Sequence, residues 1–354
     1  MSTSNQPMRL DQADLFSPKV EEYLEERAAL RRAMPDIEPQ SLIRRIVFSP
    51  YFYLSIACAI GAFIAWAICE PFVDDNSDDN GLINFFLFPM VAGFVGLFLG
   101  AVEGVMCRNL PRAAISAAVG LGVGFGGGLV ALIPAGIVFV VMVEVATAFW
   151  KDPQPGQMPT GLALLLLMMG RGAAWALVGI PAGLGQGIAV REQKVILNGI
   201  LGGLLGGLLG GLLFDPISLV FITEDGQAAA SRCIGFVTIG ILVGVFVGLV
   251  EQWTKTAWLL MRAGPLAGKQ FVLFKQSTVL GSSPKADVYL FKDDAIEPRH
   301  ALLHNRGGRF EIEDCGTADG TYVNGIPVKM QILRPGDQIV LGRTVLEFSL
   351  KEAK

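Results

Sequence analysis

The 354-residue chain contains 52% hydrophobic and 17% charged residues, a balance that excludes an ordinary soluble globular protein, in which about a quarter of residues are charged. Its length suits two or three domains, and its 43 glycines are about twice the average usage. The charges are concentrated in residues 1–45 and 264–354. The nearly uncharged segment between them indicates an integral membrane domain with two water-exposed ends.

The first 45 residues are expected to form a cytoplasmic segment rather than a domain. Within it, Val20–Met34 favours a short helix, because acidic residues come early and arginines late, and Pro35 ends it. We interpret this helix as solvated or lying on a membrane surface, with a partner-binding helix as the alternative. The polar start gives no indication of a signal peptide.

Residues 46–258 are predicted to form an α-helical transmembrane bundle of about six glycine-rich helices. About 20 apolar residues are enough to cross a bilayer core. The predicted spans are Tyr51–Cys69, Leu82–Met106, Ala113–Val143, Leu162–Val190, Val195–Phe221 and Cys233–Val250. The third span could contain a re-entrant turn at Ile133-Pro134, and one long tilted helix is preferred because it preserves the alternation of loop charge.

Loop charges predict the orientation of the bundle. The loops 70–80, 151–159 and 223–227 contain almost no Lys or Arg. Basic residues gather at the opposite helix ends and beyond: Arg44, Arg45, Arg108, Arg112, Arg191, Lys194, Lys255 and Lys269. The positive-inside rule therefore places both termini in the cytoplasm, as in a multi-pass protein of a cell (inner) membrane in contact with lipid.

Glycine recurs at every fourth residue in five of the six predicted spans. This step keeps the glycines on one helix face, where a neighbouring backbone approaches closely. The series are Gly96, Gly100 and Gly104; Gly120, Gly124 and Gly128; Gly179, Gly183 and Gly187; Gly199, Gly203, Gly207 and Gly211; and Gly240, Gly244 and Gly248. Such glycine zippers predict a tight bundle, with homo-oligomerisation as a further possibility, and are found in channels, transporters and inert anchors alike.

A few ionisable side chains interrupt the apolar spans. Arg171 lies within the fourth span, where it is expected to snorkel or to pair with Glu144. Glu103 lies near the inner end of the second span, close enough in sequence to pair with Arg108 or Arg112. Because ionisable groups in a bilayer are functional candidates by default, Glu103 and Arg171 leave a channel or transporter as an alternative.

Enzymatic and metal chemistry find little support. The cysteines Cys58, Cys69, Cys107, Cys233 and Cys315 are scattered without C-x-x-C spacing, so neither a zinc site nor a disulfide framework is indicated. Only two histidines occur, and no H-E-x-x-H or paired carboxylate arrangement is found. We therefore expect no catalytic residues, no metal, no cofactor and no enzymatic activity.

Residues 265–354 are predicted to be an all-β sandwich. Short runs rich in Val, Ile, Phe and Tyr alternate with GG, DG, NG and PGD turn signals. The segment 264–354 contains 12 Lys and Arg against 11 Asp and Glu. This balance provides no basic face, so a nucleic-acid partner is not expected.

Ordered motifs in this segment carry a family resemblance. Gly281 is followed by Asp287–Leu290, then by Ile296–Ala301, by Asp314–Gly325 (DCGTADGTYVNG) and by a closing L-x-x-G-D-x-I-x-L-G at 333–342. The whole segment, about a quarter of the chain, resembles the forkhead-associated (FHA) family. That resemblance implies a β-sandwich whose loops read phosphothreonine peptides in protein–protein interaction.

The residues that would touch phosphate depart from the family pattern. Ser282 stands in place of the family's phosphate-holding arginine, Glu297 in place of its serine, Pro298 in place of the next arginine, and Asp319 in place of an asparagine. A carboxylate repels an anionic ligand, whereas a phosphate site needs cations and hydrogen-bond donors. Three cations are possible compensating charges for the missing phosphate ligands: Lys285, Arg299 and Arg343. The candidate binding residues are Gly281, Ser282, Lys285, Glu297, Arg299, Thr317, Asp319 and Gly320.

The scaffold residues of the resemblance are kept. It implies that His300 braces the recognition loop and that Asn324 and Gly325 form a turn. The sequence thus favours a membrane scaffold or signalling adaptor with a degenerate phosphothreonine pocket. A channel or transporter regulated by this domain, and a phosphothreonine reader downstream of a Ser/Thr kinase, remain the alternatives.

Overall fold

A computed structural model describes residues 41–74, 81–150, 158–221 and 228–351. The chain divides into a helical unit that contains residues 41–256 and a β unit that contains residues 257–271 and 276–354. The expected N-terminal helix, Val20–Met34, lies outside the described residues. An α-helical bundle followed by an all-β sandwich is the fold class that the sequence predicts.

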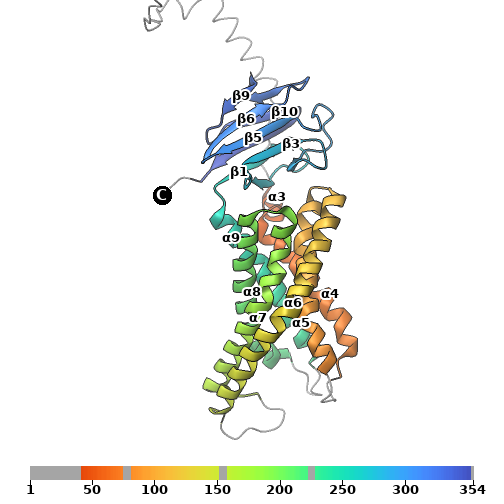
Figure 1. Ribbon diagram of the computed structural model, residues 1–354, viewed down its shortest axis with the longest axis vertical. Helices are drawn as coiled ribbons and strands as arrows, with labels where there is room; N and C mark the ends of the chain where they lie inside the picture. Colours follow the sequence, from red (N-terminus) through yellow and green to blue (C-terminus); the bar gives the residue numbers. More distant parts are fainter. Residues whose placement is uncertain (1–40, 75–80, 151–157, 222–227, 352–354) are drawn as a thin grey trace, which may run out of the picture. The chain divides into compact units, whose positions relative to one another are not determined.

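The helical unit contains six helices that are long and apolar enough to cross a membrane, in the described parts of the chain (Figure 1). A short helix, α3, precedes them. A 3-10 turn, η1, directly follows α4. The bounds are α3 Leu42–Val47, α4 Pro50–Cys69, η1 Glu70–Phe72, α5 Gly81–Met106, α6 Leu110–Thr147, α7 Gly161–Val190, α8 Gln193–Phe221 and α9 Ala229–Thr254. The predicted number of long apolar helices, six, is confirmed for the described residues.

Helix α6 runs without interruption through Pro134. The expectation of one long helix is therefore confirmed, and the alternative of a re-entrant turn is wrong. Its start follows from capping: the side chain of Asn109 accepts a hydrogen bond from the Arg112 N–H at 3.1 Å, and Pro111 occupies the first turn, where no N–H is needed. The predicted third span began later because capping residues lie outside the apolar run.

Helices α7 and α8 touch through their backbones. A Cβ atom added at Gly183 would overlap the carbonyl of Gly199, and one added at Gly179 would overlap the carbonyl of Gly203. Side chains at these positions would therefore separate the helices, as the glycine-zipper pattern predicts. The same relationship joins α5 and α6, where Gly96 meets the carbonyl of Gly120.

Helix α8 presents a second glycine face, which the four-residue series did not include. A Cβ at Gly202, Gly206 or Gly210 would overlap residues of α9. The repeated Gly-Gly pairs of α8 thus serve two neighbours, one glycine of each pair facing α7 and the other facing α9. Every glycine of the predicted zippers meets another helix of the same chain, so these faces are occupied without self-association.

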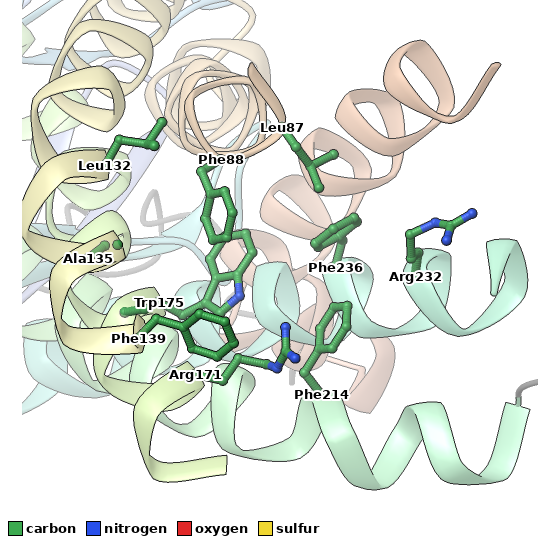
Figure 2. Close-up of a pocket in the computed structure, with 12 residues that line it drawn as sticks. Leu87, Phe88, Leu132, Ala135, Phe139, Arg171, Trp175, Phe214, Arg232 and Phe236 are labelled. Atoms are coloured by element: carbon green, nitrogen blue, oxygen red, sulfur yellow. The ribbon is translucent and has the colours of Figure 1, made fainter. Parts of the chain in front are cut away.

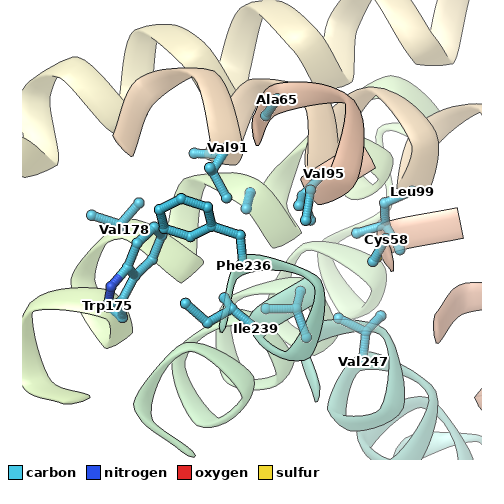
Figure 3. Packing of buried hydrophobic residues seen from close by; sticks show 14 of the residues in the cluster. Cys58, Ala65, Val91, Val95, Leu99, Trp175, Val178, Phe236, Ile239 and Val247 are labelled. Atoms are coloured by element: carbon cyan, nitrogen blue, oxygen red, sulfur yellow. The ribbon is translucent and has the colours of Figure 1, made fainter. Parts of the chain in front are cut away.

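The bundle core contains a chain of aromatic contacts between helices α5, α7, α8 and α9. The rings of Phe88 and Trp175 lie 4.7 Å apart, those of Trp175 and Phe236 5.7 Å, and those of Phe214 and Phe236 5.4 Å. Both Trp175 and Phe236 are buried, and Figure 3 shows them beside Ile239 and Val178. Aromatic pairs at these separations stabilise the packing beyond simple area burial.

The β unit is a two-sheet sandwich. One sheet has the order β2-β1-β11-β10-β7-β8 and the other the order β4-β3-β5-β6-β9. Buried and less buried residues alternate along its strands, as in Leu259, Leu260 and Met261 of β1. The bounds are β1 Ala257–Ala263, β2 Gln270–Val272, β3 Ser277–Gly281, β4 Val288–Tyr289, β5 Ala301–Arg306, β6 Arg309–Asp314, β7 Thr321–Val323, β8 Ile326–Val328, β9 Met330–Ile332, β10 Gln338–Leu341 and β11 Thr344–Leu350.

The first and last strands of the sandwich pair with each other. Strand β1 is antiparallel to β11, with Leu259 opposite Phe348 and Met261 opposite Leu346. All four side chains are almost fully buried. The sandwich therefore starts at Ala257, before residue 265, where the sequence placed the start of this domain. The predicted membrane domain, 46–258, included only Ala257 and Trp258 of this strand, and residues 259–263 were assigned to neither domain.

Candidate functional site

The loop after β3 lies directly against the loop before β5. A Cβ atom on Gly281 would overlap the carbonyl of Pro298, so only glycine allows this approach. The Ser282 N–H donates to the carbonyl of Glu297 at 2.9 Å, and the Ser283 N–H to that of Pro298 at 3.3 Å. These bonds fix Ser282 and Glu297 as neighbours at one edge of the sandwich.

His300 joins that loop to the β6–β7 loop. It is fully buried, and its Nδ1 accepts the Glu297 N–H at 3.2 Å. Nε2 therefore carries the ring proton and donates to the Gly320 carbonyl at 3.1 Å, with Thr317 Oγ1 at 3.3 Å. His300 braces the loops rather than facing outward, which is the role that the resemblance implied.

Asp314 organises the β6–β7 loop from within. Its carboxylate accepts the hydroxyls of Thr317 and Thr321, both at 2.8 Å, and the N–H groups of Gly316 and Thr317. Burial raises the pKa of Asp314, but these hydrogen bonds outweigh burial, and the pKa lies below the ordinary aspartate value. The loop is thus built around an ionised carboxylate.

Glu297 provides a second link between the same loops. Its Oε1 accepts the backbone N–H of Ala318 at 3.0 Å, although the side chain is exposed. The Ala318 N–H at this loop edge therefore already donates to a carboxylate of the protein itself. An anionic ligand bound at the same edge would need such hydrogen-bond donors. Neither this contact nor the part played by Ala318 was predicted, because it depends on how two distant loops meet.

Asn324 and Gly325 form the turn after β7. Both have positive φ angles, 53° and 79°. The Asn324 side chain accepts the Gln338 N–H at 2.9 Å and donates to Asp337 at 2.8 Å, which ties this turn to the start of β10. The pair is structural and lies apart from the loop edge that contains Glu297.

The remaining candidate residues surround the edge with mixed charge. Lys285, Arg299 and Asp319 are exposed. Arg299 lies beside Cys315, where burial raises the pKa of the thiol and Arg299 opposes the shift. The backbone N–H of Arg343 donates to the carboxylate of Asp293 at 2.7 Å. The structure therefore brings together the loop after β3, the loop before β5 and the β6–β7 loop, and these loops contain carboxylates as well as cations.

Residues 278–342 match the FHA domain family. This segment is an FHA domain. The match covers the three loops described above and leaves the helical unit outside it. FHA domains are non-catalytic modules that bind partner proteins. The general function of this part of the chain is therefore protein interaction.

Regulatory proteins share this FHA domain. The oxoglutarate dehydrogenase inhibitor of Corynebacterium efficiens is 39% identical over 93 residues, which cover 26% of this chain and 65% of the relative. The glycogen accumulation regulator GarA of Mycolicibacterium smegmatis is 38% identical over 105 residues, covering 30% of this chain and 66% of the relative. The chain thus spans less than two thirds of the length of these relatives.

Solved FHA domains align with the same segment. One, from a study of phosphothreonine-dependent FHA domain interactions, is 25% identical, with a TM-score of 0.26, and covers 28% of this chain and 100% of that domain. The FhaA FHA domain, complexed with the intracellular domain of another protein, is 26% identical, with a TM-score of 0.25, and covers 26% and 99%.

The helical unit contains its own charged pairs. Arg171 Nε lies 2.8 Å from Oδ1 of Asp215 in α8, and Asp215 is fully buried. The predicted partner, Glu144, is wrong, because α7 and α8 pack with Arg171 facing Asp215. Glu103 is half-buried, and its pairing with Arg108 or Arg112 stays a prediction.

A second pair joins α9 to the turn η1, which follows α4. Arg232 of α9 donates to both carboxylate oxygens of Glu70, through Nε at 3.0 Å and through a terminal nitrogen at 2.5 Å. Planar two-point contacts of this kind are the strongest arginine–carboxylate geometry. Neither Arg232 nor Glu70 was among the predicted polar residues, since both lie at the ends of apolar runs.

Proposed function

We propose that the chain is a multi-pass membrane protein that holds its FHA domain at the cytoplasmic face as a scaffold or signalling adaptor. The six long apolar helices support insertion into a bilayer. So does the distribution of side chains: glycines occupy the helix contacts, whereas large apolar residues such as Val130 and Ile133 of α6, 73% and 71% exposed, face outward. A soluble bundle has the opposite arrangement.

Helix ends support the orientation. Arg108 lies in the α5–α6 connection, Arg191 in the α7–α8 connection and Lys255 just after α9. Arg44 and Arg45 precede α4. In an alternating bundle these positions share one end, and the positive-inside rule assigns that end to the cytoplasm together with both termini.

The contact from Glu297 to Ala318 carries the proposal that recognition does not depend on phosphate. A phosphate group arriving at this edge would meet a carboxylate that already holds the Ala318 N–H. Repulsion between two charges at surface-like dielectric amounts to about 1–4 kcal/mol, or roughly five- to a thousandfold in affinity. The preferred ligand is a protein segment that offers a cation or backbone donors to Glu297 and Asp319.

The proposal is tested with the full-length protein in nanodiscs. A degenerate phosphothreonine peptide library and its unphosphorylated twin are titrated side by side. Equal or absent binding of the two libraries is the expected result, because the edge offers no dedicated phosphate ligands. Phosphate-dependent binding in the micromolar range would contradict it and would make the protein a phosphothreonine reader, with Lys285 or Arg299 as the cations.

The pair formed by Arg171 and Asp215 favours a second candidate, a channel or transporter with a regulatory FHA domain. Ionisable residues that face the interior of a membrane bundle commonly mark solute or ion pathways. Flux of common ions and small solutes into reconstituted vesicles, lost on Arg171→Ala, is the outcome that supports this function. Vesicles as tight as protein-free controls would rule it out for the solutes tested.

A further inference from the structure

A partly open cavity of about 380 Å³ lies among helices α5 to α9 (Figure 2). Its wall is largely aromatic, with Phe88, Phe139, Trp175, Phe214 and Phe236, and its polar groups include two arginines. Small-molecule sites are commonly about 300–1,000 Å³, mostly apolar, with a few placed polar groups. The cavity has both the size and the lining of such a site.

Arg171 lines this cavity, and only part of the hydrogen-bonding capacity of its guanidinium is used by Asp215. Asp215 holds Nε from one side, and the rings of Phe139 and Phe214 each lie 5.1 Å from the guanidinium carbon. The side chain keeps 26% of its surface exposed, and among the described residues no hydrogen bond to its terminal nitrogens is recorded. A guanidinium fork fixed at one edge presents its remaining donors to whatever enters.

The charges around the cavity favour an acidic ligand at Arg171. Asp215 is fully buried, so its carboxylate anchors the guanidinium from behind and does not line the cavity. The other arginine, Arg232, is already bound at two points by Glu70. Arg171 therefore contributes the free donors of the site, and the apolar rings around it accommodate an uncharged body.

We propose that this cavity binds an apolar organic anion, with the terminal nitrogens of Arg171 receiving its acidic group and the aromatic wall receiving the hydrocarbon part. A small free acid and the acidic headgroup region of a lipid present the same chemistry to Arg171. The site is independent of the FHA domain, and it goes beyond the adaptor role by giving the helical unit a ligand of its own.

Gly136 provides a way to close the cavity without distorting the helices. It lines the cavity, and a Cβ added to it meets nothing within 4 Å. Gly122 lies on the same helix, also has nothing within 4 Å of an added Cβ, and is not part of the lining. Gly136→Phe and Gly122→Phe thus form a matched pair, one filling the site and one leaving it open.

The experiment uses full-length protein in nanodiscs of neutral phosphatidylcholine. The probes are 4-phenylbutyrate and its neutral counterpart, 4-phenylbutanol, and binding is read from the shift in unfolding temperature with probe concentration. We expect the acid to bind roughly tenfold more tightly than the alcohol, because a charge-assisted hydrogen bond is lost with the carboxylate. Gly136→Phe should abolish the shift and Gly122→Phe should preserve it.

Two further arms decide the role of Arg171 and the source of the acid. In Arg171→Met/Asp215→Leu, which removes both charges together, the preference for the acid should disappear. Loss of the 4-phenylbutyrate shift in phosphatidylglycerol nanodiscs, with Gly136→Phe protein unaffected by the lipid, would assign the site to lipid headgroups. Its retention would assign the site to free acids.

Three results would overturn the inference. They are equal affinities for acid and alcohol, an acid-induced shift that survives Gly136→Phe, and an acid preference that survives removal of Arg171 and Asp215.

Discussion

Oε1 of Glu297 lies 3.0 Å from the backbone nitrogen of Ala318, and this contact joins two loops that are separated by a strand hairpin in the sequence. The contact runs beside the His300 bridge between the same loops. The His300 bridge is buried, whereas the Glu297 contact is exposed and is made by a charged side chain. The exposed link places a carboxylate at the loop edge, where it would oppose an anionic ligand.

Replacing Glu297 should restore some affinity for phosphate. Glu297→Ser frees the Ala318 N–H and removes the negative charge, so phosphothreonine peptides should gain about tenfold over their unphosphorylated twins. Isothermal titration calorimetry measures both affinities. Glu297→Gln, which removes the charge but keeps an acceptor for Ala318, should give a smaller gain. No gain in either variant would show that Glu297 does not exclude phosphate.

The first strand should be indispensable to the FHA domain. A fragment of residues 265–351 lacks β1 and leaves β11 without its partner, whereas a fragment of residues 256–351 keeps the pairing. Burying a side chain such as Leu259 or Met261 contributes about 1.5–3 kcal/mol each. Thermal unfolding by circular dichroism should show a cooperative transition for the longer fragment alone. Equal midpoints would mean that β1 is dispensable.

Substitution by alanine should lower stability at a glycine that contacts another helix and should not lower it at a glycine that faces open space. At Gly183 the added methyl group overlaps the backbone of Gly199, while at Gly126 it meets nothing within 4 Å. Overpacking costs about 1–3 kcal/mol, so Gly183→Ala should lower the unfolding midpoint in detergent by roughly 3–10 °C. Gly126→Ala should match or exceed the parent protein, because alanine favours helix. A neutral Gly183→Ala would contradict the backbone contact.

Arg171 and Asp215 should show strong coupling. Removing one partner leaves a buried charge, which typically destabilises by about 3–5 kcal/mol, whereas removing both does not. Arg171→Met and Asp215→Leu should therefore each lower the unfolding midpoint more than the double substitution does. Additive effects in this double-mutant cycle would show that the ion pair is not formed.

Asp314 should make the FHA domain sensitive to acid. Its folded pKa lies below the ordinary value of 3.8, so the unfolded chain binds more protons in that region and stability rises with pH. The contribution of Asp314 is complete above its unfolded pKa and is lost as pH falls through the folded pKa. The midpoint of the 256–351 fragment should therefore fall more steeply below about pH 4 than that of Asp314→Asn. Parallel curves would exclude this role.

The sequence was sufficient for elements that depend on local pattern. The predicted span Leu162–Val190 agrees closely with α7, Gly161–Val190, because uncharged apolar runs of that length have few alternatives. The β-sandwich and its turns were also readable, since Gly320 and Gly325 both adopt positive φ angles. Boundaries failed where an apolar strand, Ala257–Ala263, directly followed an apolar helix.

Contacts between distant residues were beyond the sequence. Asp215 was visible as an acid inside the predicted span Val195–Phe221, yet its pairing with Arg171 depends on the register that Gly179 and Gly203 impose on two helices. The link from Glu297 to Ala318 likewise depends on how two loops fold back. In both cases the residue type was informative, and the partner required the tertiary structure.

The order of Arg171 and Asp215 along the chain has a consequence for biosynthesis. Helix α7 is made first, so Arg171 reaches the membrane before its counter-ion exists, and an arginine inside a lone membrane helix is costly. Only Arg191 and Glu192 separate α7 from α8, and the zipper glycines join the two helices along their length. The nascent chain is therefore expected to enter the bilayer as an α7–α8 hairpin, delivering both charges already paired.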